Sequence, residues 1–244
     1  MKKIFAANWK LNKTPLESKS FCEELIKKIN PTFSEQSEIF IFPQNFSLGL
    51  VSQTVKGSGV LTGPQNIHFE TKGAFTGENS AELAAQFGCQ LVLLGHSERR
   101  QYFNENANDL NKKIKLTQKL GLTPVYCIGE SLNERQNGQT EQICFDQLES
   151  ALAEVNRDTR FVVAYEPVWA IGTGQVATVE QVADIHKKLF VKMNELGFKN
   201  FQLLYGGSVK PDNSKELLQI PHVDGFLIGG ASLEVSSFSQ ICGI

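Results

Sequence analysis

Short apolar segments alternate with longer amphipathic ones along the whole chain, and this alternation restricts the possible folds more than any other feature. The apolar segments carry few polar residues, which is typical of parallel strands buried on both faces. Eight such units in about 250 residues match the size of a closed (β/α)8 barrel. We therefore predict an α/β fold, a closed barrel of eight parallel strands. The predicted strands are 3–7, 38–42, 59–62, 90–94, 124–128, 161–165, 201–205 and 225–228.

Helices are predicted between these strands. Thr14 and Pro15 form a standard helix start, a capping hydroxyl followed by proline in the first turn. An open, doubly wound sheet is the alternative, but no G-x-G-x-x-G motif opens a first helix. No linker or break in composition divides the chain, so residues 1–244 are expected to form a single barrel domain. The other predicted helices lie near 80–87, 104–119, 131–155, 178–196 and 212–219, with a short one from Ala231.

The composition argues against several classes of function. The formal net charge of −2 provides no basic surface for nucleic acid. No apolar run reaches the roughly 18 residues that a membrane-spanning helix needs. The five cysteines are odd in number and form no C-x-x-C pair, which favours reduced thiols and a cytoplasmic location. The four histidines lack the spacing of metal ligands, so no metal site is predicted.

Unusual polar residues and glycine pairs follow the predicted strands. A barrel brings the carboxyl ends of its strands together on one rim, where catalytic groups are found. Residues far apart in the sequence are therefore expected to converge on one small ligand. They are Asn8, Lys10, His96, Glu98, Glu166, Ser208 and the pairs Gly206-Gly207 and Gly229-Gly230.

Each of these residues also has a purely structural interpretation. Lys10 could be a solvated surface charge, His96 a core histidine, and the glycine pairs ordinary turns. Glu166 could simply end a strand, since Pro167 stops the ladder directly after it. However, an apolar segment from 168 to 171 and then Gly172-Thr173-Gly174 follow, which indicates a carboxylate base beside a flexible lid.

The chemistry of this set fits proton abstraction next to a carbonyl group. Glu166 can accept a carbon-bound proton, while His96 and Lys10 can stabilise charge on oxygen. His96 precedes a predicted helix start, where the helix dipole favours a neutral ring. The glycine pairs after the last two strands occupy the place where barrels bind phosphate through backbone N–H groups.

Seven motifs occur in the order that is typical of one known family. The chain resembles the triosephosphate isomerase family, and the resemblance covers essentially all of it. The motifs are Asn8-Trp9-Lys10, Gly73-Ala74-Phe75-Thr76-Gly77-Glu78, Gly95-His96-Ser97-Glu98-Arg99-Arg100, Pro124-Val125-Tyr126-Cys127-Ile128-Gly129-Glu130, the stretch 164–174, Tyr205-Gly206-Gly207-Ser208-Val209 and Gly229-Gly230-Ala231-Ser232-Leu233.

The resemblance implies a (β/α)8 TIM barrel that interconverts dihydroxyacetone phosphate and glyceraldehyde 3-phosphate without a cofactor or metal. It assigns Glu166 as the base, His96 as a neutral electrophile, and Lys10 as the positive charge near the substrate, with Asn8 hydrogen-bonding nearby and Glu98 in a supporting role. It also implies a homodimer in which the loop carrying Thr76 inserts into the partner subunit beside Asn8 and Lys10. The residues at the family's phosphate-binding positions are Gly172, Ser208, Gly229 and Gly230.

The chain departs from the family pattern at four places. Gln175 follows the lid where lysine is common, and Asn104 replaces a glycine after the helix that starts at His96. Asparagine tolerates the left-handed conformation, so we expect that turn to survive. Pro64 and the pair Ile67-His68 also differ, which leaves the dimer contacts of this loop least secure. The alternative functions are another phosphate-binding barrel enzyme and a catalytically silent barrel used as a binding protein.

Overall fold

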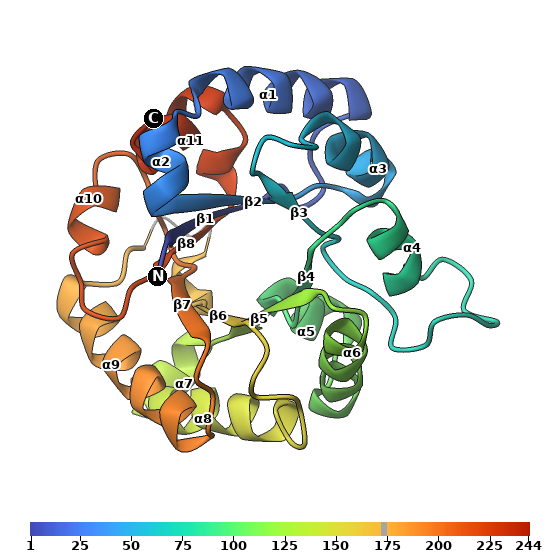
Figure 1. Cartoon of the computed structure of the whole chain (residues 1–244). Helices are drawn as coiled ribbons and strands as arrows, with labels where there is room; N and C mark the ends of the chain where they lie inside the picture. Colours follow the sequence, from blue (N-terminus) through green and yellow to red (C-terminus); the bar gives the residue numbers. More distant parts are fainter. Residues whose placement is uncertain (172–174) are drawn as a thin grey trace.

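The computed structural model describes residues 1–171 and 175–244 and shows a parallel eight-stranded sheet in the order β3-β2-β1-β8-β7-β6-β5-β4. Figure 1 shows the strands curling around the middle of the molecule with helices outside them. The predicted barrel is thereby confirmed. The strands are β1 (Lys3–Asn8), β2 (Ser37–Phe42), β3 (Leu61–Thr62), β4 (Leu91–Leu94), β5 (Thr123–Ile128), β6 (Phe161–Tyr165), β7 (Phe201–Tyr205) and β8 (Gly225–Ile228).

The barrel closes between β3 and β4 through a short seam. β3 has two residues, and its continuation at Pro64 has no N–H to donate. Two backbone hydrogen bonds bridge the seam, from Gln90 N–H to the Thr62 carbonyl (2.9 Å) and from Leu93 N–H to the Pro64 carbonyl (3.0 Å). Gly63 permits the close approach, since a Cβ there would lie 2.1 Å from the Leu91 carbonyl oxygen. The prediction of a strand over 59–62 was therefore too long.

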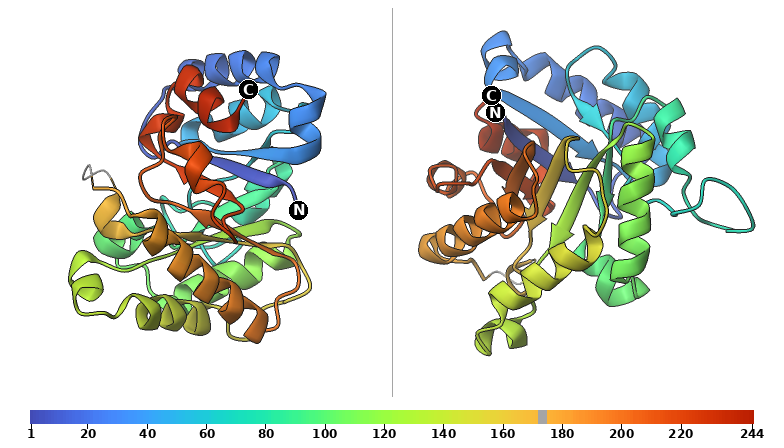
Figure 2. Two further views of the ribbon diagram at one scale, coloured as in Figure 1. Left: turned by 90° about the vertical axis from the view of Figure 1, so that its left-hand side faces the viewer. Right: turned by 60° about the horizontal axis from the view of Figure 1, so that its bottom comes forward.

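The helices surround the sheet, as Figure 2 shows from two further sides. Thr14 caps the first helix as predicted, with its hydroxyl accepting from Glu17 N–H and Glu17 accepting from Thr14 N–H. The α-helices are α1 (Pro15–Lys28), α2 (Pro31–Gln36), α3 (Asn45–Thr54), α4 (Ala81–Gln86), α5 (Ser97–Phe103), α6 (Ala107–Lys119), α7 (Leu132–Gln136), α8 (Thr140–Ala151), α9 (Val179–Glu195), α10 (Ser214–Leu217) and α11 (Val235–Cys242); the 3-10 turns are η1 (Val168–Ala170) and η2 (Gly230–Ser232).

Several predicted helix boundaries were wrong. The single helix predicted over 131–155 is two helices, because Gly138 adopts a left-handed conformation (φ 71°) between α7 and α8. The helix predicted from 104 begins only at Ala107, since Asn104 is left-handed and caps the end of α5. The short helix expected from Ala231 is the 3-10 turn η2, followed by α11. Helices α2 and α3 were not predicted.

The apolar core forms two layers separated by the sheet. Side chains alternate along each strand, so that in β1 Ile4 and Ala6 point into the barrel while Phe5 and Ala7 contact the helices. The inner layer is filled by branched and aromatic residues, which makes the barrel interior a packed core instead of a pore. In the described part of the chain, no helix is both long and apolar enough to cross a membrane.

One segment extends away from the barrel. The chain between β3 and α4 runs outward beyond the ring of helices, as Figures 1 and 2 both show. This segment contains Phe75 and Thr76, and the tilted rings of His68 and Phe75 have centroids 4.0 Å apart. It is the segment for which insertion into a partner subunit is predicted.

Candidate active site

A cavity of about 360 Å³ opens at the carboxyl ends of the strands. It brings together nine of the residues predicted to act on a ligand, from β1, β4, β6, β7 and β8 or the residues that follow them. Glu98 lies beside this cavity, whereas Gly172 lies outside the described residues. The lining residues are Asn8, Lys10, Asn12, His96, Glu166, Ile171, Gly206, Gly207, Ser208, Val209, Lys210, Leu227, Gly229, Gly230 and Ala231.

A carboxylate and an imidazole meet at the inner end of the cavity. Glu166 follows β6 and His96 caps α5, and they are only 2% and 5% exposed. The Nε2 atom of His96 lies 3.0 Å from Oε1 of Glu166. The backbone N–H of Ser97 donates to Oε2 of the same carboxylate at 3.1 Å. Glu166 is therefore held by two donors at the start of α5.

The surroundings of His96 define which nitrogen carries its proton. Its Nδ1 atom accepts a hydrogen bond from the backbone N–H of Glu98 at 3.3 Å, which requires an unprotonated Nδ1. Nε2 then carries the proton and donates to Glu166. Burial lowers the pKa of His96, but the Glu166 carboxylate more than offsets this, so its pKa lies above the ordinary value in this arrangement.

The pKa of Glu166 is shifted in the opposite direction. Burial raises the pKa of this carboxyl, but His96, the Ser97 N–H and the Lys10 ammonium lower it more, so the net pKa lies below its ordinary value. Glu166 is thus ionised but weakly basic while it contacts Ser97. Loss of these two hydrogen bonds would make it a stronger base.

Lys10 is held in an unusual backbone conformation. Its φ is 51°, in the left-handed region that costs a residue with a Cβ about 1 kcal/mol. The side chain of Asn8 accepts from Lys10 N–H at 3.1 Å, and Gln65 donates to the Lys10 carbonyl at 2.9 Å. The ammonium pairs with Oε1 of Glu98 at 2.5 Å. Asn8 and Glu98 therefore both fix Lys10.

Glycines after β7 and β8 form the opposite wall. A Cβ on Gly206 would lie 2.9 Å from the Glu166 side chain, and one on Gly207 would lie 2.2 Å from the Tyr205 hydroxyl. The chain can take this course only because both are glycines. Gly230 begins η2, so its N–H belongs to the first helical turn, where backbone donors have no partner within the helix. This wall suits an anion.

A buried glutamate that the sequence did not reveal anchors the start of the expected lid. Glu130 is fully buried after β5 and accepts from the Tyr165 hydroxyl (3.0 Å), the Trp169 indole (3.0 Å) and Arg135 (3.1 Å). Its sequence signals are its position shortly after a strand and its place at the end of the motif Pro124-Val125-Tyr126-Cys127-Ile128-Gly129-Glu130. Trp169 lies in η1, so the segment leading toward the undescribed residues is tied to the barrel.

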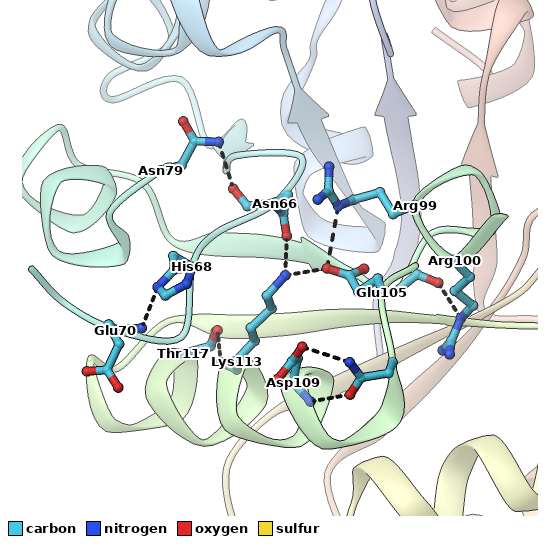
Figure 3. Close-up of polar contacts among 12 residues, drawn as sticks. Asn66, His68, Glu70, Asn79, Arg99, Arg100, Glu105, Asp109, Lys113 and Thr117 are labelled. Carbon is cyan, nitrogen blue, oxygen red and sulfur yellow. Dashed lines mark hydrogen bonds and ion pairs between the residues drawn. The ribbon is translucent and has the colours of Figure 1, made fainter. Parts of the chain in front are cut away.

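A second buried ion pair lies behind α5, as Figure 3 shows. Lys113 of α6 contacts Glu105 and also donates to Asn66 at 2.9 Å. Arg99 adds a further contact to Glu105 at 3.4 Å. This cluster joins α5, α6 and the segment after β3 outside the cavity. In the described part of the chain, no group of three or more histidine, cysteine, aspartate or glutamate side chains is arranged to hold a metal ion.

The rim of the barrel thus carries a buried carboxylate beside an imidazole, a lysine and a wall suited to anions. Such groups are typical of enzymes that move protons on small phosphorylated carbonyl compounds. The family model for triosephosphate isomerase matches residues 3–244. The chain belongs to the triosephosphate isomerase family. It is accordingly an enzyme with that family's isomerase function.

Individual relatives agree over the full length of the chain. A triosephosphate isomerase from Bdellovibrio bacteriovorus is 49% identical, with 100% of both chains covered. One from a Picosynechococcus species is 42% identical over 98% of this chain and 97% of its own. One from Aquifex aeolicus is 40% identical over 99% and 98%.

Proposed function

We propose that the enzyme interconverts dihydroxyacetone phosphate and D-glyceraldehyde 3-phosphate by moving one proton between neighbouring carbons, with Glu166 as the base. The observation that carries this proposal is the buried contact of 3.0 Å between Glu166 and His96 in a cavity that also contains Lys10. Glu166 takes the carbon-bound proton, and the C–H electrons move toward the carbonyl oxygen to form an enediolate. The same carboxyl returns the proton to the adjacent carbon, while a proton passes from the hydroxyl oxygen to the former carbonyl oxygen through His96, so that the carbonyl group changes carbon.

The base must first leave its resting contacts. In the structure both carboxylate oxygens accept hydrogen bonds, from Ser97 and His96. Movement toward a substrate in the cavity removes these bonds and raises the pKa of Glu166 toward the value that proton abstraction requires. It also leaves Nε2–H of His96 free to donate to a substrate oxygen. One displacement therefore prepares both groups.

The remaining residues stabilise and hold negative charge. The Lys10 ammonium supplies a positive charge for the enediolate and the phosphate, and Asn8 and Glu98 fix its position. Ser208, Gly229 and Gly230 line the wall that would bind the phosphate, and the resemblance adds Gly172 to this group. A closed lid would exclude water from the enediolate.

Replacement of Lys10 by methionine tests this charge assignment. The variant keeps the side-chain length but removes the ammonium, so both KM and kcat should deteriorate because substrate and transition state are anionic. The measurement is steady-state turnover of glyceraldehyde 3-phosphate in a coupled assay. Lys187→Met is the matched control, since it makes the same change at an exposed position of α9 and should leave the kinetics unchanged. Unchanged kinetics for Lys10→Met would remove Lys10 from the site.

We further propose that a second copy of this chain covers the exposed face around Lys10, so that the enzyme is a homodimer. Leu11 and Phe46 are 86% and 87% exposed, and Tyr102 and Phe103 are also exposed. A second cavity of about 360 Å³, beside Asn8 and Lys10, is lined by Leu11, Gln65, Tyr102 and Phe103 among others. The segment that carries Phe75 and Thr76 extends away from the barrel, where a second copy could receive it.

Light scattering with size-exclusion chromatography tests this homodimer. The wild type should elute as a dimer, and Thr76→Arg should shift it toward a monomer with lower activity, because Lys10 loses its cover. Val191→Arg places the same charge at a half-exposed position on α9 and should remain dimeric. A monomeric, fully active wild type would contradict the proposal.

A cytoplasmic location is also proposed, since all five cysteines are unpaired and buried.

A further inference from the structure

Arg100 lies on α5, yet its guanidinium points back toward the strands. Its Nε–H donates to the Gly95 carbonyl at 2.8 Å, while Nη2 donates to the Tyr126 hydroxyl at 3.0 Å and the Cys127 carbonyl at 2.9 Å. Figure 3 shows that Arg99 reaches Glu105 whereas Arg100 points to the other side of that cluster. One side chain thus joins the end of β4 to the end of β5.

Gly95 is shaped to receive this side chain. Its φ is +70°, in the region that favours glycine. A Cβ at this position would lie 2.9 Å from the Tyr126 ring, 3.0 Å from Nη2 of Arg100 and 3.1 Å from the Cys127 carbonyl oxygen. The junction between Arg100 and β5 therefore occupies all the space beside Gly95.

The junction lies between the two halves of the catalytic pair. On one side, Gly95 is followed directly by His96 and by Ser97, whose N–H holds the Glu166 carboxylate. On the other side, Cys127 is followed by Ile128, whose carbonyl accepts from the backbone N–H of Glu166 at 2.7 Å. A shift of α5 relative to β5 would therefore change the separation of His96 and Glu166.

We propose that Arg100 is a positioning residue for the isomerase reaction, which sets the separation of His96 and Glu166 by joining α5 to the end of β5. It lines a neighbouring cavity of about 390 Å³ and not the one that would hold substrate, so it acts only through the residues that it fixes. The inference rests on the proposed roles of His96 and Glu166. Lysine cannot replace it, because an ammonium lacks the planar fork that reaches three acceptors on two strands.

The experiment compares Arg100→Lys with Arg160→Lys. Arg160 contacts Glu38 and Gln202 through the same kind of fork, but it lies before β6 at the opposite end of the barrel. Arg100→Lys should lower kcat by about 10- to 100-fold, the effect expected from a small misplacement of catalytic groups, with little change in KM. Arg160→Lys should lower the melting temperature and leave kcat unchanged.

Tyr126→Phe provides a second, milder variant. It removes the hydroxyl that accepts from Arg100 and leaves the two carbonyl acceptors in place. It should fold and show a smaller decrease in kcat than Arg100→Lys, with unchanged KM. It therefore tests the role of Arg100 if Arg100→Lys does not fold. The expected order of kcat is wild type, then Tyr126→Phe, then Arg100→Lys.

The reference variant Glu166→Gln separates two kinds of failure. Suppose that Glu166→Gln is inactive but folded Arg100→Lys keeps wild-type kcat. The proposed role of Arg100 is then wrong, while the catalytic assignment of Glu166 stands. Tyr126→Phe is used in the same way if Arg100→Lys does not fold. An equal loss of kcat in Arg160→Lys would also overturn the role, because the effect would then be one of general stability. If Glu166→Gln itself retains turnover, the proposed mechanism fails first.

Discussion

Two buried histidines in this molecule have different surroundings and therefore different chemistry. His96 contacts a carboxylate, which raises its pKa, and it lines the cavity. His186 of α9 is fully buried between Tyr165 and Tyr205, and Nδ1 contacts the His222 carbonyl at 3.0 Å. In the described part of the chain its Nε2 has no partner. Burial is the main reason that the pKa of His186 is lowered to about 4.

The lowered pKa of His186 predicts a loss of stability in acid. As the pH falls below about 6.5, the unfolded state binds a proton that the folded state does not accept until about pH 4. The free energy of unfolding should therefore decrease by about 3 kcal/mol between these values on account of this residue. Urea unfolding at pH 7 and pH 4.5 measures it. His186→Asn should reduce the pH dependence; an unchanged dependence in this variant would contradict this account.

Helix α5 is the element on which the site depends most. His96 caps its start, the Ser97 N–H donates to Glu166, and the helix carries Glu98 in its first turn and Arg100 in its last. It ends at Asn104, which has φ 51° and ψ 34°. Asn104 thus adopts the left-handed conformation that asparagine tolerates.

The left-handed end of α5 predicts how substitutions at Asn104 behave. Asn104→Gly should leave the free energy of unfolding unchanged or slightly higher, because glycine adopts this conformation without strain. Asn104→Val should lower it by about 1–2 kcal/mol, the cost of the left-handed conformation for a residue with a bulky Cβ. Denaturant melts of the two variants measure the difference. Equal stability of both would indicate that the helix does not need this cap.

At the scale of the whole molecule, the two ends of the barrel have different tasks. The carboxyl ends of the strands carry the cavity, whereas the opposite end is closed by Arg160, Glu38 and Gln202. Arg160→Leu should cost about 2 kcal/mol of stability through the lost charged hydrogen bonds, with unchanged kcat and KM. Thermal melts and the coupled assay test this together. A fall in kcat would show that the two ends are coupled.

The sequence predicted the barrel well because strand burial is a local pattern. The ends of seven strands lie within one or two residues of the predicted ranges. Only β3 (Leu61–Thr62) is much shorter than predicted. Helix breaks were harder to predict, since Gly138 could equally be tolerated within a helix.

The site was predictable in its members but not in its contacts. Residues at strand ends could be grouped on one rim, which is how Asn8, Lys10, His96 and Glu166 were selected. The contact between Glu166 and Ser97 depends on the distance between β4 and β6, which no local pattern contains. Glu130 and Arg100 stand in the quoted motifs but received no role for the same reason, because their contacts are made by neighbouring strands and helices.

The central claim is that Glu166 is the base, and Glu166→Gln tests it most directly. Glutamine has the same size and can still contact Ser97 N–H, so the variant should fold with a melting temperature close to that of the wild type. It cannot accept the carbon-bound proton, so kcat for glyceraldehyde 3-phosphate should fall by at least about 10²- to 10⁴-fold. A folded Glu166→Gln variant with near wild-type kcat would contradict the mechanism.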